Sequence, residues 1–418
     1  RYVDYMYSYP HKTAYRPFPA PVSLLPYLEQ LQGRKASLYF HIPFCSHKCG
    51  YCNLFSLQTN RTEYIATYLD TLHRQAQQLS PLTAGLTFDS FAIGGGTPLL
   101  LTVPQLEQLM ATAALFGVHP SHAFTSVETS PEYADRPRLN VLKKAGVSRV
   151  SIGIQSFQDE ELKAIKRRPR QNTIYQALDD IRQMDFPYFN IDLIYGIKGQ
   201  TVESFLYSLE EALRFQPNEL FIYPLYVRQG TGITEREPDD VCFRMYRAAC
   251  KLLQAKGFLQ TSMRRFIHHP STDAEVSCGD EVMLSCGSGG RSYLGDLHYA
   301  TRYTVCQQCI AREIDEYMAT TDFTVARNGF ILSAKEQQQR FIIKNLMYYM
   351  GIDKAEYTRR FGEPLDRTPL FRQLAEQYWI EETPERIRLT PEGLGYSDYI
   401  GQLFITPEIR QLMETYSY

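Results

Sequence analysis

The chain has 418 residues, with 44 basic and 46 acidic side chains, a formal net charge of −2 and 44% hydrophobic residues. This ordinary globular balance gives no bulk attraction to nucleic acid, and the length suits one large α/β domain plus a smaller one. No apolar run approaches the roughly 20 residues of a membrane span, and the start is not signal-like. Nine cysteines, three of them clustered, suit a reducing compartment. We therefore expect a cytoplasmic protein with no membrane span and no nucleic-acid partner.

Residues 1–36 are rich in tyrosine and proline. The prolines exclude a long helix before Leu24, so the segment is predicted to be an extended arm. Two interpretations stay open for it: packing across the main domain, or a flap whose aromatic rings cover a flat ligand.

From Ser37 the pattern alternates between strand and helix. Apolar runs predict strands at 37–42, 88–94, 124–128, 149–154, 188–194 and 219–224. Helical periodicity predicts helices at 63–79, 104–116, 137–145, 159–165, 173–184 and 201–215, the second opened by a capping box of Thr102 and Gln105. This alternation predicts parallel βα units, with functional residues at the carboxyl ends of the strands.

The pattern changes after Asp239. A helix over 239–256, a strand over 258–266 and a glycine-rich stretch over 277–303 precede a helix at 305–318. Helices at 335–350, 354–361 and 370–378 and a hairpin near 387–390 form a further unit. We divide the chain into an arm (1–36), an α/β domain with accessory elements (37–325) and a helical C-terminal domain (326–418).

Three cysteines follow the first strand directly, with the spacing C-x3-C-x2-C: Cys45, Cys49 and Cys52. Soft thiolates select iron–sulfur clusters, zinc or Cu(I), and a cubane cluster is normally held by four cysteines. With three, one iron stays open for a substrate or cofactor, as in catalytic metal sites. The alternative is a zinc knuckle completed by His41 or His47.

The sequence motifs around this loop resemble those of a known family. Tyr-x-His-Ile-Pro-Phe-Cys at 39–45, followed by Gly-Gly-Gly-Thr-Pro at 94–98, resembles the radical S-adenosylmethionine (SAM) superfamily. The branch is the one that contains oxygen-independent coproporphyrinogen III oxidase, haem chaperones and class C methyltransferases. The resemblance implies an α/β fold, a (β/α)6 partial TIM barrel with a winged-helix-like C-terminal domain. It also implies a 4Fe-4S cluster on the three cysteines, whose open iron chelates SAM. An electron, from a donor such as flavodoxin or ferredoxin, then releases a 5′-deoxyadenosyl radical.

The same resemblance implies which residues surround SAM. Glycines allow close backbone approach, a carboxylate and an amide suit ribose hydroxyls, and an arginine suits a carboxylate. The implied residues are Tyr39, Tyr51, Gly94, Gly95, Gly96, Thr97, Glu128, Gln155, Arg167, Asp192 and Ile194. Ordinary packing of the two tyrosines, capped strand ends and another arginine within 166–170 remain alternatives. In the coproporphyrinogen enzymes that the chain resembles, the tyrosine that matches Tyr39 touches SAM and two SAM molecules are bound, and a second SAM would suit methyl transfer.

The sequence departs from two members of this branch, the oxidases and the chaperones, and each departure argues against that function. The oxidases carry a further cysteine two residues past the last ligand, where this chain has Leu54. The chaperones carry a His-Asn-x-x-Tyr-Trp motif, whereas the only tryptophan here is Trp379. Together with the tyrosine-rich arm, the sequences at 264–269, 278–281 and 286–292 resemble those of the anaerobic haem-utilisation enzymes of the anaerobilin synthase (HutW/ChuW) type. Those open haem by radical methylation and release its iron.

Haem as substrate would need an axial ligand and partners for its propionates. The candidates are His268 or His269, with Arg264, Arg265 and Arg291, and the alternative is a surface turn before Pro270. Cys278 and Cys286 are candidate radical-quenching thiols, and together with Cys306 and Cys309 they are also a candidate second metal site.

The sequence therefore predicts an anaerobic radical SAM methyltransferase that opens haem to a linear tetrapyrrole and frees iron, with two SAM molecules. The rivals are a haem-binding chaperone of the same branch and a class C methyltransferase acting on another substrate.

Overall fold

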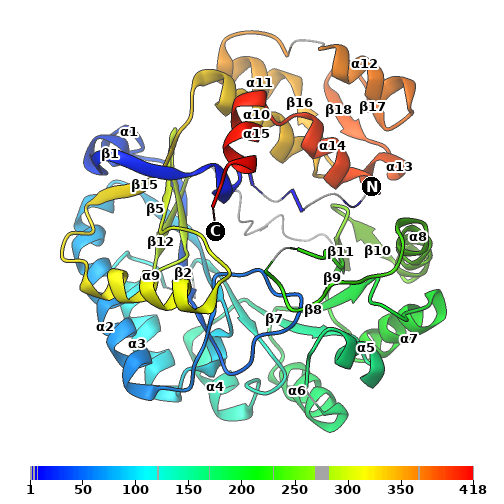
Figure 1. Cartoon of the computed structure of the whole chain (residues 1–418), viewed down its shortest axis with the longest axis horizontal. Coiled ribbons are helices and arrows are strands. Elements are labelled where there is room, and N and C mark those ends of the chain that lie inside the picture. The colour runs from blue at the N-terminus through cyan, green and yellow to red at the C-terminus, as the bar shows by residue number, and fades with distance from the viewer. Residues whose placement is uncertain are drawn as a thin grey trace.

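The computed structural model describes residues 2, 5–6, 8–119, 122–168, 170–228, 230–268, 282–365 and 368–417. Its main feature is a large curved sheet, whose central strands run parallel (Figure 1). In spatial order these strands are β12 (Val282–Cys286), β2 (Lys35–Ile42), β5 (Thr87–Gly95), β6 (Phe124–Thr129), β7 (Arg149–Gln155), β8 (Tyr188–Tyr195) and β9 (Glu219–Pro224).

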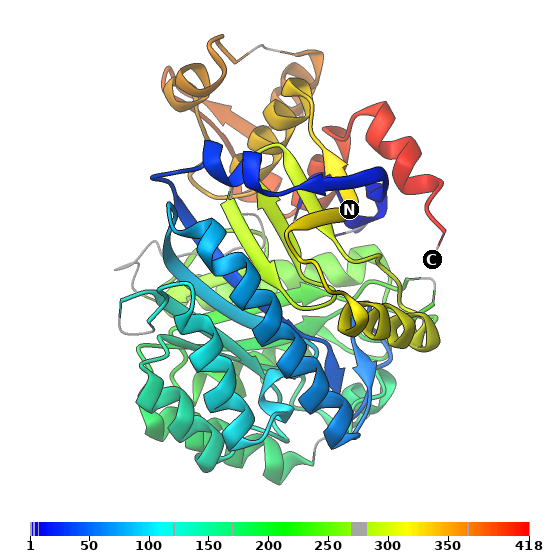
Figure 2. The same cartoon turned by 90° about the vertical axis from the view of Figure 1, so that its left-hand side faces the viewer.

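Helices cover the outer, convex face of this sheet (Figure 1): α2 (Thr62–Leu79), α3 (Val103–Ala114), α4 (Arg136–Ala145), α5 (Asp159–Ala164), α6 (Gln171–Met184), α7 (Val202–Leu213) and α8 (Asp239–Ala255). Figure 2 shows α2 and α3, in blue and light blue, lying across the sheet. The capping box of Thr102 and Gln105 opens α3, as predicted. Apolar side chains on both faces of the strands exclude water and hold the layers together. The partial barrel and its predicted βα units are confirmed.

Both edges of the sheet carry antiparallel strands. On one side β13 (Arg291–Leu294), β14 (Leu297–Ala300), β15 (Val325–Ile331) and β1 (Arg16–Ser23) follow β12. On the other, β11 (Arg265–His268) and β10 (Phe258–Gln260) follow β9. The single strand predicted over 258–266 is wrong, because a turn closed by the Thr261 amide and the Arg265 carbonyl (2.9 Å) folds it into a hairpin. The glycine-rich stretch proved to contain β12, a further parallel strand.

Short elements complete this part of the chain. They are η1 (Lys12–Ala14), α1 (Leu25–Gln30), β3 (Phe44–Cys45), β4 (Leu57–Gln58), η2 (Ser80–Thr83), η3 (Pro98–Leu100) and α9 (Gln307–Ala319). No helix of the described chain has the length and apolar character needed to cross a membrane.

A second hydrophobic core lies above the barrel in Figure 1. It is built from α10 (Ala334–Leu346), α11 (Lys354–Phe361), α12 (Pro369–Glu376), α13 (Pro391–Leu394), α14 (Ser397–Leu403), α15 (Pro407–Glu414) and the antiparallel sheet β16 (Ile352–Asp353), β18 (Arg386–Leu389) and β17 (Ile380–Glu382). The predicted hairpin is shifted: residues 387–389 lie in β18, which pairs with the preceding β17, and the residues after Thr390 form α13. Because β15 belongs to the large sheet, the C-terminal part of the second core begins with α10, and Met6, Tyr9 and Ala14 of the arm also belong to this core. The exact domain limits stay predictions.

The arm connects the two cores. Tyr2 packs edge-on against Tyr195 with ring centroids 6.0 Å apart, and Tyr5 against Tyr223 at 6.2 Å. The Tyr9 hydroxyl donates to Glu336 of α10. The arm therefore packs across the barrel and also places an aromatic ring against an inward-facing strand residue.

Candidate active site

The cysteine loop leaves the carboxyl end of β2. Phe44 anchors the loop as a fully buried side chain, and the short strands β3 and β4 pair in parallel to close it. The Thr97 hydroxyl lies 3.6 Å from Cys45 Sγ, and Ser56 Oγ lies 4.0 Å from Cys52 Sγ. Three half-buried thiols thus share one short loop.

The thiols are poised for a metal. Burial raises the pKa of Cys45 to about 11, opposed by Thr97, and the charges of Cys52 and Cys49 raise it further. A cation that replaces the protons would relieve this repulsion. Among the described residues, no three His, Cys, Asp or Glu side chains converge on one metal ion. A cubane does not require such convergence, because each cysteine binds a different iron.

The histidines of the zinc alternative have other partners. His41 Nε2 lies 2.9 Å from the Phe55 carbonyl, and His47 Nε2 lies 2.8 Å from the Lys166 carbonyl. Each ring nitrogen therefore donates to a backbone oxygen. The described geometry favours three cysteines without a histidine ligand.

The glycine segment lies directly beside the loop, since β2 and β5 pair with His41 opposite Gly94 and Ile42 opposite Gly95. A Cβ on Gly96 would stand 2.5 Å from the Phe44 carbonyl and 2.8 Å from Cys45 Sγ. A Cβ on Gly94 would stand 2.8 Å from Glu128 Oε2 and 2.9 Å from the Tyr39 hydroxyl. These two glycines are required for the loop and the strand-end polar groups to approach so closely.

Tyr39 and His41 form a chain of hydrogen bonds. Burial lowers the pKa of His41 to about 4, with Lys12 and Arg291 acting in the same direction, so the ring is neutral. Because Nε2 donates to Phe55, Nδ1 accepts from the Tyr39 hydroxyl at 3.1 Å. The oxygen lone pairs of Tyr39 are then directed away from His41.

Two carboxylates face the interior from β6 and β8, the strands on either side of β7. Burial raises the pKa of Asp192 to about 7, and the charges of Glu128 and Glu219 raise it further, although Asn190 donates to Asp192 at 2.7 Å and Arg149 opposes the shift. Burial also raises the pKa of Glu128, opposed by the Gly95 amide. The Glu128 side chain is nevertheless reached by solvent, which means that water enters the interior beside it.

Gln155 and Arg167 complete this edge. Gln155 has a φ of 74°, in the left-handed region that costs a side chain energy, at an irregular step of the β7–β8 ladder. Its Oε1 is buried and accepts no hydrogen bond from the described residues. Arg167 donates to the Gly153 carbonyl at 2.8 Å and to the Tyr51 hydroxyl at 3.3 Å, whereas the neighbouring Arg168 and Arg170 are exposed.

The residues present therefore fit a cluster and SAM. The donor set consists of three thiols, the glycines leave a cradle that a Cβ would fill, and a buried amide oxygen lacks a donor. Thr97 contacts Cys45, and Ile194 is buried in β8, where its carbonyl accepts from Gln200. That these residues hold SAM stays a prediction.

The proposed haem arginines need correction. Arg264 is buried and forms an ion pair with Asp398 of α14, where the Tyr226 hydroxyl also donates. Arg265 forms a buried ion pair with Glu219. Because both guanidinium groups serve internal pairs, we withdraw them as partners of propionates.

His268 and Cys286 are also displaced from the site. β11 runs antiparallel to β9, and Ile267 pairs with Glu219, the first residue of β9, so His268 lies at the edge opposite the cysteine loop. Cys286 is fully buried and pairs with Phe40, so it shares the helix-facing side with Phe40 while Ser285 shares the interior side with Tyr39. His269 and Cys278 lie outside the described residues.

Arg291 stays near the predicted site. It begins β13, donates to Ser8 of the arm at 2.6 Å, and its charge reaches His41. Sequence reasoning missed His41 as the partner of Tyr39, and it missed Tyr223, whose ring contacts Tyr5 and whose hydroxyl feels Asp192. The sequence neighbours of both residues are apolar, so no local signal marks them, and only the fold brings each of them to its partner.

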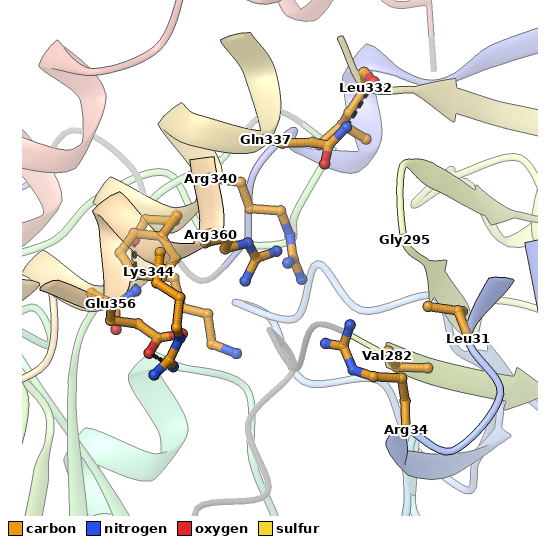
Figure 3. A pocket seen from close by; sticks show the side chains of 13 residues that line it. Leu31, Arg34, Val282, Gly295, Leu332, Gln337, Arg340, Lys344, Glu356 and Arg360 are labelled. Atoms are coloured by element: carbon orange, nitrogen blue, oxygen red, sulfur yellow. Dashed lines mark hydrogen bonds and ion pairs between the residues drawn. The ribbon is translucent and has the colours of Figure 1, made fainter. Parts of the chain in front are cut away.

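A separate pocket lies between the barrel and the second core (Figure 3), with a volume of about 440 Å³. Cationic side chains line it, namely those of Arg34, Arg340, Lys344, Arg359 and Arg360, and Figure 3 labels all of them except Arg359. Arg359 pairs with Glu356, and the other four have interactions of their own within the chain. We assign this pocket to the junction of the cores and not to the candidate active site.

A three-cysteine loop beside a glycine segment, at the carboxyl edge of a partial barrel, defines a radical SAM site. Comparison with known families agrees: residues 39–212 match the Radical SAM superfamily and residues 332–395 match the HemN C-terminal domain. The oxygen-independent coproporphyrinogen III oxidase of Salmonella typhimurium is 31% identical over 86% of this chain and 83% of its own length. The haem chaperone HemW of Bacillus subtilis is 27% identical over 88% of this chain and all of its own length.

The structure of coproporphyrinogen III oxidase (HemN) from Escherichia coli has the same fold, with a TM-score of 0.81, 23% identity and coverage of 96% of this chain and 97% of that one. The chain belongs to the radical SAM superfamily and, within it, to the HemN-like branch. Membership implies a 4Fe-4S cluster and SAM as cofactors.

Proposed function

We propose that this chain is a radical SAM enzyme that acts on haem. The observation that carries its enzymatic character is a set of polar groups on the inner side of the sheet: the Glu128 carboxyl beside Gly94, the Asp192 carboxyl, and the Gln155 oxygen, which accepts no hydrogen bond from the described residues. The buried Gln155 oxygen without a donor is costly, and carboxyls with a raised pKa are typical of functional sites, so this arrangement suits a ligand.

Haem as the ligand is supported by the relatives. Their names refer to haem and to a porphyrinogen, both of them tetrapyrroles with carboxylate side chains. In this chain, the charges of Arg291 and Lys12 reach His41 beside the site. Guanidinium and ammonium groups at that position suit propionates.

The specific reaction we propose is methylation of haem followed by opening of the ring to a linear tetrapyrrole, with release of iron, as in the anaerobilin synthase (HutW/ChuW) type. Leu54, 46% exposed, stands where the resemblance places the extra cysteine of the oxidases. When bound, the cluster and SAM supply a carbon-centred radical, and a second SAM supplies the methyl group.

The residues of the chain have distinct parts in this proposal. Tyr39, fixed by neutral His41, presents lone pairs, and Glu128 presents a carboxylate held by the Gly95 amide. Asp192, with a pKa of about 7, holds or releases a proton at its carboxyl near neutral pH. Arg167 donates hydrogen bonds to the Tyr51 hydroxyl of the cysteine loop and to the Gly153 carbonyl, and so links the loop to β7.

The second candidate is a haem-binding chaperone that releases haem unchanged. It is favoured by the chaperone relative whose entire length aligns with this chain. The missing chaperone motif, with Trp379 the only tryptophan and located in the second core, supports the enzyme instead.

One experiment separates the two. Protein reconstituted anaerobically is incubated with SAM, a strong reductant and haem, while the Soret band is followed and products are analysed by mass. We expect loss of the band, with 5′-deoxyadenosine, S-adenosylhomocysteine and a methylated linear tetrapyrrole. If haem binds but remains intact, the result supports the chaperone function instead of the enzyme. Absence of haem binding would overturn both.

Cys49→Ala is the control, because it removes one ligand and leaves the interior of the barrel unchanged. This variant should bind haem and produce neither nucleoside product. Loss of the Soret band in Cys49→Ala would show that haem is destroyed by the reductant alone.

A further inference from the structure

Two further cysteines lie at the start of α9. Cys306 is the residue that precedes the helix and is exposed, and Cys309 lies in its first turn and is half-buried. Residues three apart at a helix start have Cβ atoms about 5–6 Å apart. A small rotation brings such a pair within the reach of a disulfide.

The two thiols interact with each other. The Cys309 thiol and the backbone amides of Cys309 and Gln308 lower the pKa of Cys306, since they stabilise its thiolate, whereas this contact raises the pKa of Cys309. The exposed thiol of Cys306 is therefore the more readily ionised of the two, and Cys309 lies beside it.

The pair lies next to the cysteine loop. Gln307 accepts from the Gln58 amide at 2.8 Å and donates to the Ser56 carbonyl at 2.9 Å. Lys48, between the first two cluster cysteines, donates to the Val305 carbonyl at 3.2 Å. The residues on both sides of Cys306 therefore hold the loop that carries Cys45, Cys49 and Cys52.

We propose that Cys306 and Cys309 form a redox-active dithiol that is converted reversibly to a disulfide by small-molecule disulfides. The Cys306 thiolate attacks the disulfide RSSR and forms a Cys306–SR bond while one RS⁻ leaves. Cys309 then loses its proton, attacks Cys306 sulfur and expels the second RS⁻. The protein gives up two electrons and two protons, and RSSR is reduced to two RSH.

A metal site is the rival explanation for two such thiols. A closed zinc site needs four ligands, and within the described residues no third His, Cys, Asp or Glu joins this pair. Zinc bound in proportion to protein and protecting both thiols from alkylation would overturn the proposal.

The test exposes the reconstituted protein, without oxygen, to mixtures of reduced and oxidised glutathione, followed by alkylation and trypsin. Both cysteines fall in one peptide, Tyr303–Arg312. We expect this peptide to change from doubly alkylated to unalkylated and lighter by two hydrogens as the oxidised fraction rises, and to revert with excess thiol. A peptide that stays doubly alkylated at every ratio would refute the dithiol.

Single variants assign the roles. Cys309→Ser should trap glutathione on Cys306, whereas Cys306→Ser should leave Cys309 mostly unmodified. Cys250, half-buried in α8 and with its pKa raised to about 12 by burial, is the internal control. Cys306 should be modified more than about tenfold faster than Cys250. Equal rates, or no adduct in Cys309→Ser, would contradict an activated Cys306. No outcome depends on whether haem is the substrate.

Discussion

Charged side chains in this protein lie in two kinds of setting, and they are paired with each other in only one of them. At the junction of the cores, Arg264 is paired with Asp398, which also accepts from Tyr226; at the amino edge of the large sheet, Glu219 is paired with both Arg149 and Arg265. At the carboxyl edge of the sheet, Glu128 and Asp192 form no ion pair within the described part of the chain. The same residue types are matched in one place and left unmatched in the other.

The difference separates structure from function. A buried charge that loses its partner is strongly destabilising, so these buried side chains form ion pairs with each other. Carboxyls with raised pKa beside a cradle of glycines are instead typical of a ligand site. The arginines at 264 and 265, which from sequence suit propionates, belong to the first group.

Among substitutions in the candidate active site, Gly96→Val should have the largest effect. The added side chain would meet the Phe44 carbonyl and Cys45 Sγ, so the loop would have to leave the glycine segment. We expect loss of the cluster, measured as absent iron and absent absorbance after anaerobic reconstitution, with helix content retained. Gly85→Val is the matched control, because a Cβ there meets mainly the flexible Gln32 side chain. A cluster retained by Gly96→Val would contradict the tight packing of loop and segment.

At the junction of the cores, the substitution Asp398→Ala removes the ion-pair partner of Arg264. Arg264 would remain buried without its partner, and we expect a loss of about 3–5 kcal/mol in the free energy of unfolding, measured with urea. The surface pair of Arg388 and Glu381 is the comparison, since its side chains are about half exposed. Glu381→Ala should cost under about 1 kcal/mol. Equal losses would show that the junction charges are no more important than surface charges.

Asp192 gives a smaller, pH-dependent effect. Its pKa rises from 3.8 to about 7 on folding, so the folded protein binds the proton more tightly than the unfolded chain. Its contribution to stability is therefore complete below about pH 4 and is lost as the pH rises through 7. Asp192→Asn should remove this loss and be about 1–3 kcal/mol more stable than the parent at pH 8, without a difference at pH 4. Urea unfolding at both values measures it, and a difference at pH 4 as large as at pH 8 would exclude the titration of Asp192 as the cause.

Sequence reasoning found the parts of the site that are local. The cysteine spacing, the glycine segment and the strand-end residues stand in continuous stretches, and parallel strands bring their ends together without further information. It failed where partners are distant: Arg264 meets Asp398 across 134 positions and Arg265 meets Glu219 across 46. Cys286 failed for another reason, since the face that it occupies depends on its register with β2.

The smallest expected effect is the one at His268. Because β11 places it at the edge opposite the cysteine loop, beside Phe258, His268→Ala should leave haem affinity unchanged. Arg291→Gln changes a cation whose charge reaches His41 and should weaken haem binding several-fold, measured by titration of the Soret band in the absence of SAM. The contrast tests where haem lies: weakened binding in His268→Ala with normal binding in Arg291→Gln would move haem to the opposite edge of the sheet, away from the cluster.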